Sequence, residues 1–176
     1  LTCTEVTCEP IVCEGTPEVE PNNGPVDFGG DDSFGAIACG ETVCGTTSTV
    51  GDTTRDTDWF ELLLLEDNIL TVDLDVEEFN GLLFVLDAAY NTVASADLAG
   101  FCEDEQLVTN CLAPGTYYVW VGHNDFSGVD VPANYGVTVS CELCTPPAYM
   151  PCQPVAGVDA SWTFGTAEVD MGDATG

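Results

Sequence analysis

Lysine is absent from the sequence, and arginine and histidine occur once each, as Arg55 and His123. Against this one permanent cation stand 31 acidic residues, which give a net charge of -30 at pH 7. Binding to nucleic acid needs arginine and lysine in numbers, so this class of function is excluded. Attraction to anionic lipid is excluded for the same reason. An acidic surface of this kind can bind divalent cations, can function at high salt where the repulsion between its charges is screened, or can keep the protein soluble.

Long hydrophobic runs are also lacking. No apolar stretch approaches the roughly 20 residues that span a bilayer, so no membrane insertion is predicted. Hydrophobic residues nevertheless make up 45% of the 176 residues, which argues against disorder and is enough for one domain with a core and short extensions. No signal peptide is visible at Leu1, and we expect this to be the processed N-terminus of a secreted chain.

Motifs of catalysis are missing as well. The sequence contains no G-x-S-x-G, no H-E-x-x-H and no phosphate-binding loop. A catalytic triad would have to be built on His123, which follows a strand in a Gly/Asp loop where surface histidines are common. Acidic residues are so numerous that any two could be proposed as the acid and base of a glycosidase, so the sequence indicates no particular pair. We therefore expect no enzyme activity. A secreted enzyme with an unrecognised site is a third alternative, after an assembly module and an accessory binding domain.

Cysteine, in contrast, is abundant. The even number of ten predicts a disulfide framework formed in an oxidising, extracellular compartment. A zinc site is disfavoured because the single C-x-x-C has no second pair and the single histidine has no partner. A redox site is disfavoured because that C-x-x-C lies in a proline-rich stretch instead of opening a helix. The cysteines are Cys3, Cys8, Cys13, Cys39, Cys44, Cys102, Cys111, Cys141, Cys144 and Cys152.

Two pairings suggest themselves from proximity in the sequence. Cys39 with Cys44, and Cys102 with Cys111, are close enough to clip single hairpins or loops. The six remaining cysteines lie in the two terminal segments and would pair with one another or reach a neighbouring molecule, since the termini of a domain often lie close together. The pairing cannot be derived from the sequence alone.

Strand patterns dominate the middle of the chain. In residues 69–76 apolar and polar side chains alternate strictly, which predicts a half-buried strand. No stretch of ten or more residues has a helical period, and strands recur at the spacing expected of a sandwich, so we predict an all-β fold. The predicted strands cover residues 59–65, 69–76, 81–88, 92–96, 106–112, 116–121 and 135–140.

Composition divides the chain into three segments. Residues 1–16 are rich in cysteine, residues 17–140 carry nearly all strand signals, and residues 141–176 combine a Cys/Pro-rich stretch with a polar tail. The middle segment contains the motifs E-V-E-P-N-N (residues 18–23), D-T-D-W-F (56–60), A-P-G-T-Y-Y-V-W-V (113–121) and N-Y-G-V-T-V (134–139).

With these motifs, residues 17–140 resemble the pre-peptidase C-terminal domains of secreted bacterial and archaeal proteins. The resemblance implies a β-sandwich of the jelly-roll type that is itself non-catalytic and often accompanies a protease. The chain departs from the family in its added cysteines and in Trp120, where a basic residue is common.

The same resemblance implies a calcium site. Collagen-binding members of the family hold calcium near their N-terminal linker, and the matching positions here are Glu18, Glu20, Asn22, Asn23 and Asp58. Calcium takes six to eight oxygen ligands, which carboxylates and amides supply. The alternative is a solvated acidic linker with a turn at the two asparagines.

Aromatic residues on the strands raise the question of a binding platform for sugar or peptide. Half of them should face the core, because strand side chains alternate, and Tyr117 and Trp120 are expected on opposite faces. Arg55 is expected to pair with nearby acids such as Asp52 or Asp56, which are also further candidates as calcium ligands. The aromatic residues considered are Trp59, Trp120, Trp162, Tyr117, Tyr118 and Tyr135.

The tail contains a strand-like stretch, residues 160–167, beyond the last expected strand of the sandwich. Ser161, Trp162, Thr163 and Phe164 form its centre and could add to another molecule by strand pairing. The sequence thus favours an extracellular structural module that self-associates, as the repeating subunit of a surface filament or layer held by strand addition and disulfides. The alternative is an accessory domain of a secreted hydrolase that binds polysaccharide or protein fibres.

Overall fold

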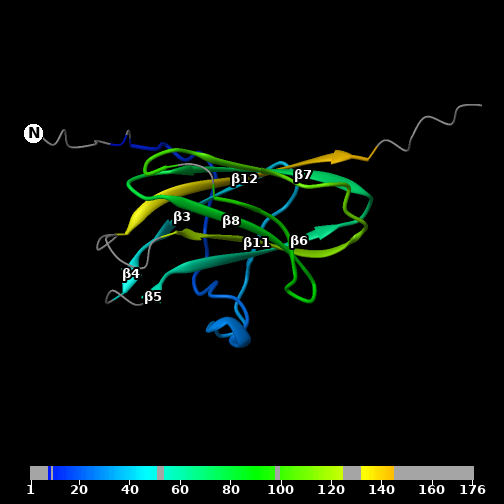
Figure 1. Ribbon diagram of the computed structural model, residues 1–176, viewed down its shortest axis with the longest axis horizontal. Coiled ribbons are helices and arrows are strands. Elements are labelled where there is room, and N and C mark those ends of the chain that lie inside the picture. The colour runs from blue at the N-terminus through cyan, green and yellow to red at the C-terminus, as the bar shows by residue number, and fades with distance from the viewer. Residues whose placement is uncertain (1–7, 9, 51–53, 98–99, 125–131, 145–176) are drawn as a thin grey trace, which may run out of the picture. The chain divides into compact units, whose positions relative to one another are not determined.

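A computed structural model describes residues 8, 10–50, 54–97, 100–124 and 132–144 (Figure 1). Two compact units divide the chain, Leu1–Cys144 and Thr145–Gly176. All of the second unit, including the strand-like residues Ser161, Trp162, Thr163 and Phe164, lies outside the described residues. The fold below is therefore that of the first unit.

Twelve strands and one short helix make up the described part of the chain, which contains no α-helix. Among these residues no helix is both long enough and apolar enough to cross a membrane. The elements are β1 (Thr16–Pro17), the 3-10 helix η1 (Val26–Phe28), β2 (Gly35–Ala36), β3 (Glu41–Thr47), β4 (Thr49–Val50), β5 (Thr54–Arg55), β6 (Thr57–Leu64), β7 (Asn68–Val76), β8 (Gly81–Asp87), β9 (Thr92–Ala96), β10 (Glu105–Val108), β11 (Gly115–His123) and β12 (Ala133–Leu143).

Ten of the strands form two packed sheets, and Figure 1 shows the long strands running side by side in two layers. We call the sheet in the order β1-β3-β12-β7-β10 the first sheet and that in the order β2-β6-β11-β8-β9 the second sheet. The short strands β1 and β2 pair in parallel with β3 and β6, whereas the other pairs are antiparallel. The predicted all-β sandwich of the jelly-roll type is confirmed.

The core lies between the sheets and follows from the alternation of the strands. Leu70, Val72, Leu74 and Val76 of β7 are all buried, whereas the residues between them are not, as the sequence predicted. Side chains of β6, β8 and β11 meet them from the second sheet in one contiguous cluster. Each large apolar side chain buried in this way stabilises the fold by about 1.5–3 kcal/mol.

All seven predicted strands are present, with ends that differ by a few residues, but β3 was missed. Its inward positions are Val43, Gly45 and Thr47 instead of a row of large apolar residues, so its alternation carries no strong hydrophobic signal. Gly45 is small for a reason: a Cβ there would lie 2.3 Å from the hydroxyl of Tyr135, whose ring fills this part of the core.

The two predicted loop disulfides are wrong. The structure joins Cys39 to Cys141 and Cys8 to Cys102. Four residues lie between Cys39 and Cys44, and β3 extends the chain by about 3.3 Å per residue, which carries Cys44 away from Cys39. The register that pairs Val139 with Glu41 instead continues to place Cys141 opposite Cys39.

The other two disulfides also join residues that are far apart in the sequence. They are Cys13–Cys44 and Cys111–Cys144. Thus the terminal segments do not pair with each other as expected: each described terminal cysteine is bonded to the body of the sandwich. Cys3 and Cys152 lie outside the described residues.

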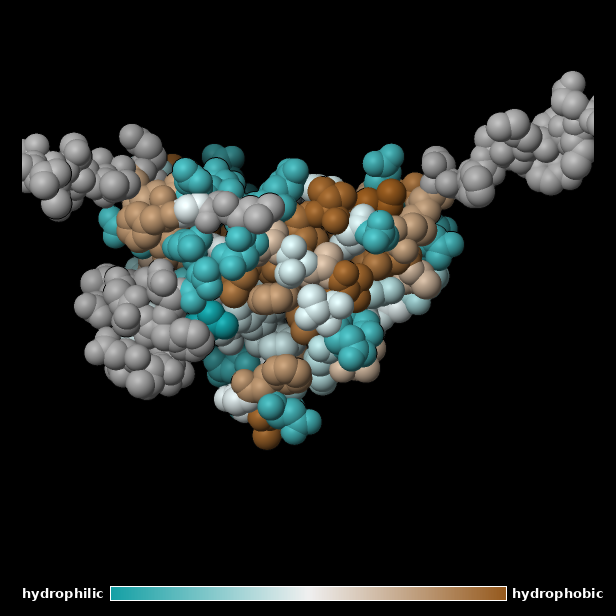
Figure 2. Space-filling model, viewed as in Figure 1, coloured by the Kyte–Doolittle hydropathy of each residue, from teal (hydrophilic) through white to brown (hydrophobic). Residues whose placement is uncertain are grey.

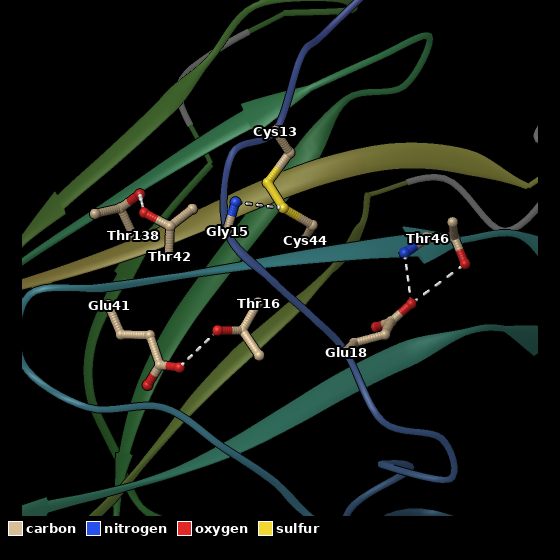
Figure 3. Close-up of a disulfide and its surroundings, with 9 residues drawn as sticks. All are labelled: Cys13, Gly15, Thr16, Glu18, Glu41, Thr42, Cys44, Thr46 and Thr138. Carbon is tan, nitrogen blue, oxygen red and sulfur yellow. Dashed lines mark hydrogen bonds between the residues drawn. A yellow bond between two sulfur atoms is a disulfide. The ribbon is translucent and has the colours of Figure 1, made fainter.

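The segment that enters the sandwich lies along β3, as Figure 3 shows. The Cys13–Cys44 disulfide fixes it, and the backbone N–H of Gly15 lies 3.1 Å from Cys44 Sγ. Thr16 Oγ1 donates a hydrogen bond to Glu41 at 3.1 Å, and the N–H of Glu18 donates to the carbonyl of Cys44 at 2.8 Å. The segment therefore arrives at Glu18 in a fixed position.

The outward face of the first sheet carries acidic side chains. Asp73 of β7 accepts a hydrogen bond from Gln106 of β10 at 2.6 Å. Partial desolvation, followed by the neighbouring carboxylates of Asp104 and Asp73, raises the pKa of Asp75 above its ordinary value of 3.8. Like charges on neighbouring strands thus oppose folding at neutral pH.

Removing the long-range disulfide should destabilise the protein. The Cys39→Ser/Cys141→Ser double variant frees a loop closed across 102 positions, and we expect the free energy of unfolding to fall by about 2–5 kcal/mol. Chemical denaturation measures this, with Cys13→Ser/Cys44→Ser as the matched pair closing only 31 positions and expected to cost less. Peptide mapping of the native protein should recover Cys39 linked to Cys141; a Cys39–Cys44 peptide would contradict the assignment.

Neutralising Asp75 should stabilise the protein at neutral pH only. Because its pKa is raised in the folded state, the wild type loses stability as the pH rises from 3.8 through the raised pKa. Asp75→Asn removes this loss, by at most about 1 kcal/mol because solvent screens the repulsion, or about 2–4 °C in Tm at pH 7.

At pH 3 wild type and Asp75→Asn should melt together, since the carboxyl is protonated in both the folded and the unfolded wild type. Glu142→Gln, which removes an exposed acid from neighbouring β12, is the control and should leave Tm unchanged. Equal stabilisation by Asp75→Asn at both pH values would refute the charge explanation.

Candidate functional site: a carboxylate cluster beside an aromatic pocket

Three acidic side chains converge where the entering segment meets the second sheet. Carboxylate oxygens of Glu18, Glu20 and Asp58 all lie within 4.8 Å of one another. The two glutamates follow β1, and Asp58 is the second residue of β6. Asp58 is fully buried because it belongs to the inward face of β6, on which Phe60 and Leu62 follow.

The hydroxyl of Tyr135 lies between two of these carboxylates. Its oxygen is 2.8 Å from Asp58 Oδ2 and 3.0 Å from Glu18 Oε2. A phenol donates one proton, so it can satisfy one of the two carboxylates at a time. Burial, followed by the charges of Asp58 and Glu18, raises the pKa of Tyr135, so this hydroxyl stays protonated and acts as a donor.

The far oxygen of Glu18 is held by β3. Glu18 Oε1 accepts hydrogen bonds from the backbone N–H of Thr46 at 2.7 Å and from its hydroxyl at 3.3 Å (Figure 3). This leaves Oε2 directed toward Tyr135 and Asn22, whose Nδ2 lies 3.4 Å away. Glu18 is thereby oriented by strands of the first sheet.

The cluster is electrostatically unfavourable on its own. Burial, followed by the charge of Glu18, raises the pKa of Asp58 well above its ordinary value. Burial and the same glutamate also raise the pKa of Glu20. Either a proton or a cation must therefore compensate the crowded carboxylates.

Two buried oxygens next to this cluster have no hydrogen-bond partner. They are Asp58 Oδ1 and Asn22 Oδ1, and both residues are completely buried. A buried acceptor left without a partner costs about 1–3 kcal/mol and is rare in native proteins. A donor set made only of carboxylate and amide oxygens fits a hard cation such as calcium, so the residues fit the ion that the resemblance implied.

The other predicted ligands lie around this cluster. Asn23 follows Asn22, but its backbone N–H donates to Ser33 Oγ at 3.0 Å and the residue lines the neighbouring pocket. Asp56 is half-buried, and burial followed by the charge of Glu20 raises its pKa. Asp52 lies outside the described residues.

Aromatic side chains gather on the outward face of the second sheet. Trp59, Tyr118 and Trp120 form a second apolar cluster there with Leu82 and Leu86, separate from the core between the sheets. Phe34, Phe84 and Tyr90 pack against it. The alternation of β11 thus places Tyr117 and Trp120 on opposite faces as expected, since Tyr117 packs with the core. Tyr135 of β12 also belongs to the core. Trp162 lies outside the described residues.

A pocket of about 790 Å³ opens over part of this aromatic cluster. Its sheet side is made by Trp59, Phe84 and Trp120, and Phe28 with Gly29 to Asp31 forms the side contributed by the loop around η1. In Figure 1 η1 is the coiled turn at the bottom of the view, and Figure 2 shows brown and tan side chains at that tip. Val26 and Phe28 are 58% and 62% exposed there.

The loop that forms this wall is closed on itself. The N–H of Gly24 donates to the carbonyl of Ser33 at 2.8 Å, and the N–H of Asp32 donates back to Gly24 at 2.8 Å. Gly24 has a φ of +75°, and a Cβ there would fall 2.4 Å from the ring of Trp59. Only glycine therefore lets the loop lie directly on this tryptophan.

Arg55 forms the opposite wall and was expected to pair with acids. Its guanidinium donates to the carbonyls of His123 at 2.8 Å and Asn124 at 3.4 Å. The expected partner Asp52 lies outside the described residues, so pairing with acids stays a prediction. The guanidinium also stands 5.2 Å from the ring centre of Trp120, a cation–π contact. Burial lowers its pKa. At position 120 the family commonly has a basic residue, whereas this chain has a tryptophan. The basic group beside its ring comes from Arg55 of β5.

His123 is not the surface residue that its Gly/Asp context suggested. It is 1% exposed at the end of β11, because that strand continues two residues past the predicted end. Its Nε2 lies 3.2 Å from the carbonyl of Ser48. The histidine joins β11 to the β3–β4 connection, and the structure places no nucleophile at hydrogen-bond distance from it among the described residues.

Comparison with known proteins finds 12 chains of solved structures that are similar to this one. Neither a family model nor a curated protein matches the sequence. One of them is the 1.0 Å crystal structure of the pre-peptidase C-terminal domain of a collagenase from Bacillus anthracis, with 18% identity and a TM-score of 0.47 over 60% of this chain and 92% of that chain. The resemblance predicted from the sequence is to this same family. At such an identity and TM-score the match says nothing of ligands or activity.

Proposed function

We propose that this domain is a non-catalytic accessory module of a secreted protein that attaches to an insoluble extracellular polymer through the outward face of its second sheet. The observation that carries the proposal is the aromatic cluster on that face, with its pocket of about 790 Å³. The outward face of the first sheet is different, since β7 and β12 present Thr, Asp and Ser there. Trp59, Tyr118 and Trp120 are themselves buried, and the apolar side chains exposed on this side include Phe28 and Leu63, at 62% and 61%. Exposed apolar side chains beside a pocket are typical of a binding surface.

The disulfides support a location outside the cytoplasm. Four bonds join the described cysteines, and such bonds persist in oxidising compartments. A net charge of -30 would keep a domain with an aromatic face soluble before it binds the polymer.

Calcium is the cofactor that the carboxylate cluster is proposed to bind. Glu18, Glu20 and Asp58 would supply carboxylate oxygens, and Asn22 would supply the amide oxygen that has no partner. The ion would neutralise the repulsion that raises the pKa of Asp58. Because three of these ligands come from the entering segment and one comes from β6, the ion would fix that segment to the sandwich.

Filament assembly, the other function predicted from the sequence, rests on Ser161 to Phe164. These residues lie outside the described part of the chain. The aromatic face and its pocket belong to the described residues and favour the accessory binding module.

Attachment to polymer is tested by sedimentation with insoluble cellulose, chitin and collagen. We expect the wild type to co-sediment with at least one of them. The double variant Phe34→Ala/Leu63→Ala, which trims the outward face of the second sheet outside the pocket, should reduce the bound fraction at least twofold. Val108→Ala, an equally exposed apolar truncation on β10 of the first sheet, is the control. Failure of the wild type to sediment with any polymer would refute the proposal.

Calcium binding is tested by titration calorimetry and thermal melting. Free calcium at about 100 times Kd should stabilise the wild type by about 2.7 kcal/mol. Asp58→Asn should abolish this response while leaving the calcium-free protein at least as stable as the wild type, because it removes a buried charge. Asp67→Asn, which alters an exposed aspartate before β7, should respond like the wild type. No calcium-dependent shift at millimolar concentrations would contradict the site.

A further inference from the structure

We infer that the pocket beside η1 is a subsite for pyranose rings of a neutral polysaccharide. The inference rests on the proposed function, since it names the chemistry of the polymer that the outward face would hold. The volume of about 790 Å³ falls within the range of about 300–1,000 Å³ typical of small-molecule sites. It is large enough for more than one sugar ring.

The lining combines the two kinds of surface that a sugar presents. Phe28, which is 62% exposed, provides apolar ring surface from the loop, and the partly buried Phe84 provides it from the sheet. Trp59 and Trp120 form the floor with the small part of each ring that is exposed, 4% and 7%. A pyranose ring has apolar C–H faces that pack against such rings. Polar groups surround the same space, including Asn23 and Thr57, and they can donate to and accept from sugar hydroxyls.

The charges that line the pocket distinguish between neutral and charged ligands. Asp31 and Asp56 line the pocket together with Arg55, and the chain as a whole carries -30. This field repels uronate, sulfated or phosphorylated polymers. Hydrogen bonds from Ser33 lower the pKa of Asp31, so this carboxylate remains an acceptor at neutral pH. An entirely apolar ligand would leave these polar groups unpaired.

A basic peptide would be attracted by the net charge, but the pocket opposes it. The guanidinium of Arg55 already lies 5.2 Å from the centre of the Trp120 ring. A second cation seeking the same ring would meet this charge at short range. A neutral, hydroxyl-rich ligand meets neither the repulsion of the acids nor that of the arginine.

Hydrogen bonds and a ring contact hold the walls of the pocket in place without a ligand. Backbone hydrogen bonds close the loop between Gly24 and Ser33, and the carbonyls of His123 and Asn124 hold the guanidinium of Arg55. Phe28 contacts Trp59 with ring centroids 5.8 Å apart. Little conformational entropy is therefore lost on binding, as expected of a formed subsite.

Titration calorimetry with soluble tetrasaccharides tests the assignment on the full chain. The probes are β-1,4-linked tetramers of glucose, N-acetylglucosamine and mannose, with tetragalacturonate as the anionic probe and a tetralysine peptide as the basic one. We expect at least one neutral tetramer to bind with a Kd below about 1 mM and neither charged probe to bind. Stronger binding of tetralysine or tetragalacturonate than of every neutral tetramer would overturn the inference.

Two substitutions on η1 make a matched pair. Phe28→Ala removes an exposed ring that lines the pocket, whereas Val26→Ala removes an equally exposed side chain of the same helix that does not line it. Phe28→Ala should weaken neutral tetramer binding at least fivefold, and Val26→Ala less than twofold. Equal effects of the two variants would overturn the assignment to the pocket.

Failure of this inference is distinguishable from failure of the proposed function. If the wild type sediments with an insoluble polymer but binds no neutral tetramer, the binding module stands and the subsite falls. If it neither sediments nor binds a tetramer, both fall. Unchanged melting temperatures of both η1 variants will show that neither result comes from unfolding.

Discussion

The structure depends on burying one carboxylate, that of Asp58, inside a sandwich that already carries a net charge of -30. The Tyr135 hydroxyl compensates part of this charge from within the core, and the Gly45 position leaves space for the tyrosine to reach it. Glu18 is drawn to the same hydroxyl although it is also acidic. The disulfide at Cys13 and the pairing of β1 with β3 hold the entering segment against this repulsion.

Asp58 and Trp59 are consecutive in β6, so their side chains point to opposite faces of the second sheet. One belongs to the carboxylate cluster and the other to the aromatic pocket. The entering segment contacts both, because Asn22 donates to Glu18 while its carbonyl accepts from the N–H of Trp59 at 2.9 Å. Two residues later Gly24 lies on the tryptophan ring. The seven residues from Glu18 to Gly24 therefore link the two sites through backbone and side-chain contacts.

Much of this arrangement could be predicted from the sequence. The strict alternation of β7 and the aromatic strand β11 fixed both their type and their buried faces, and the motif at residues 18–23 with Asp58 pointed to the carboxylates that do converge. Strand β3 was not predicted because small and polar residues occupy inward positions of this strand. The disulfides could not be predicted because they join residues that only the fold brings together, such as Cys39 and Cys141 across 102 positions. The pocket could not be predicted because its lining residues are spread along the chain from Asn23 to Trp120 and no periodicity connects them.

Arg55 has a consequence for the life of the domain outside the cell. Trypsin-like proteases cleave after arginine and lysine, and this chain offers them one peptide bond. Its guanidinium is held by two carbonyls and a tryptophan ring, whereas a protease must draw that side chain into its own specificity pocket. The residue that completes the pocket wall is thereby also withheld from digestion. While the domain is folded, a whole class of extracellular proteases finds nothing in the described chain to cut.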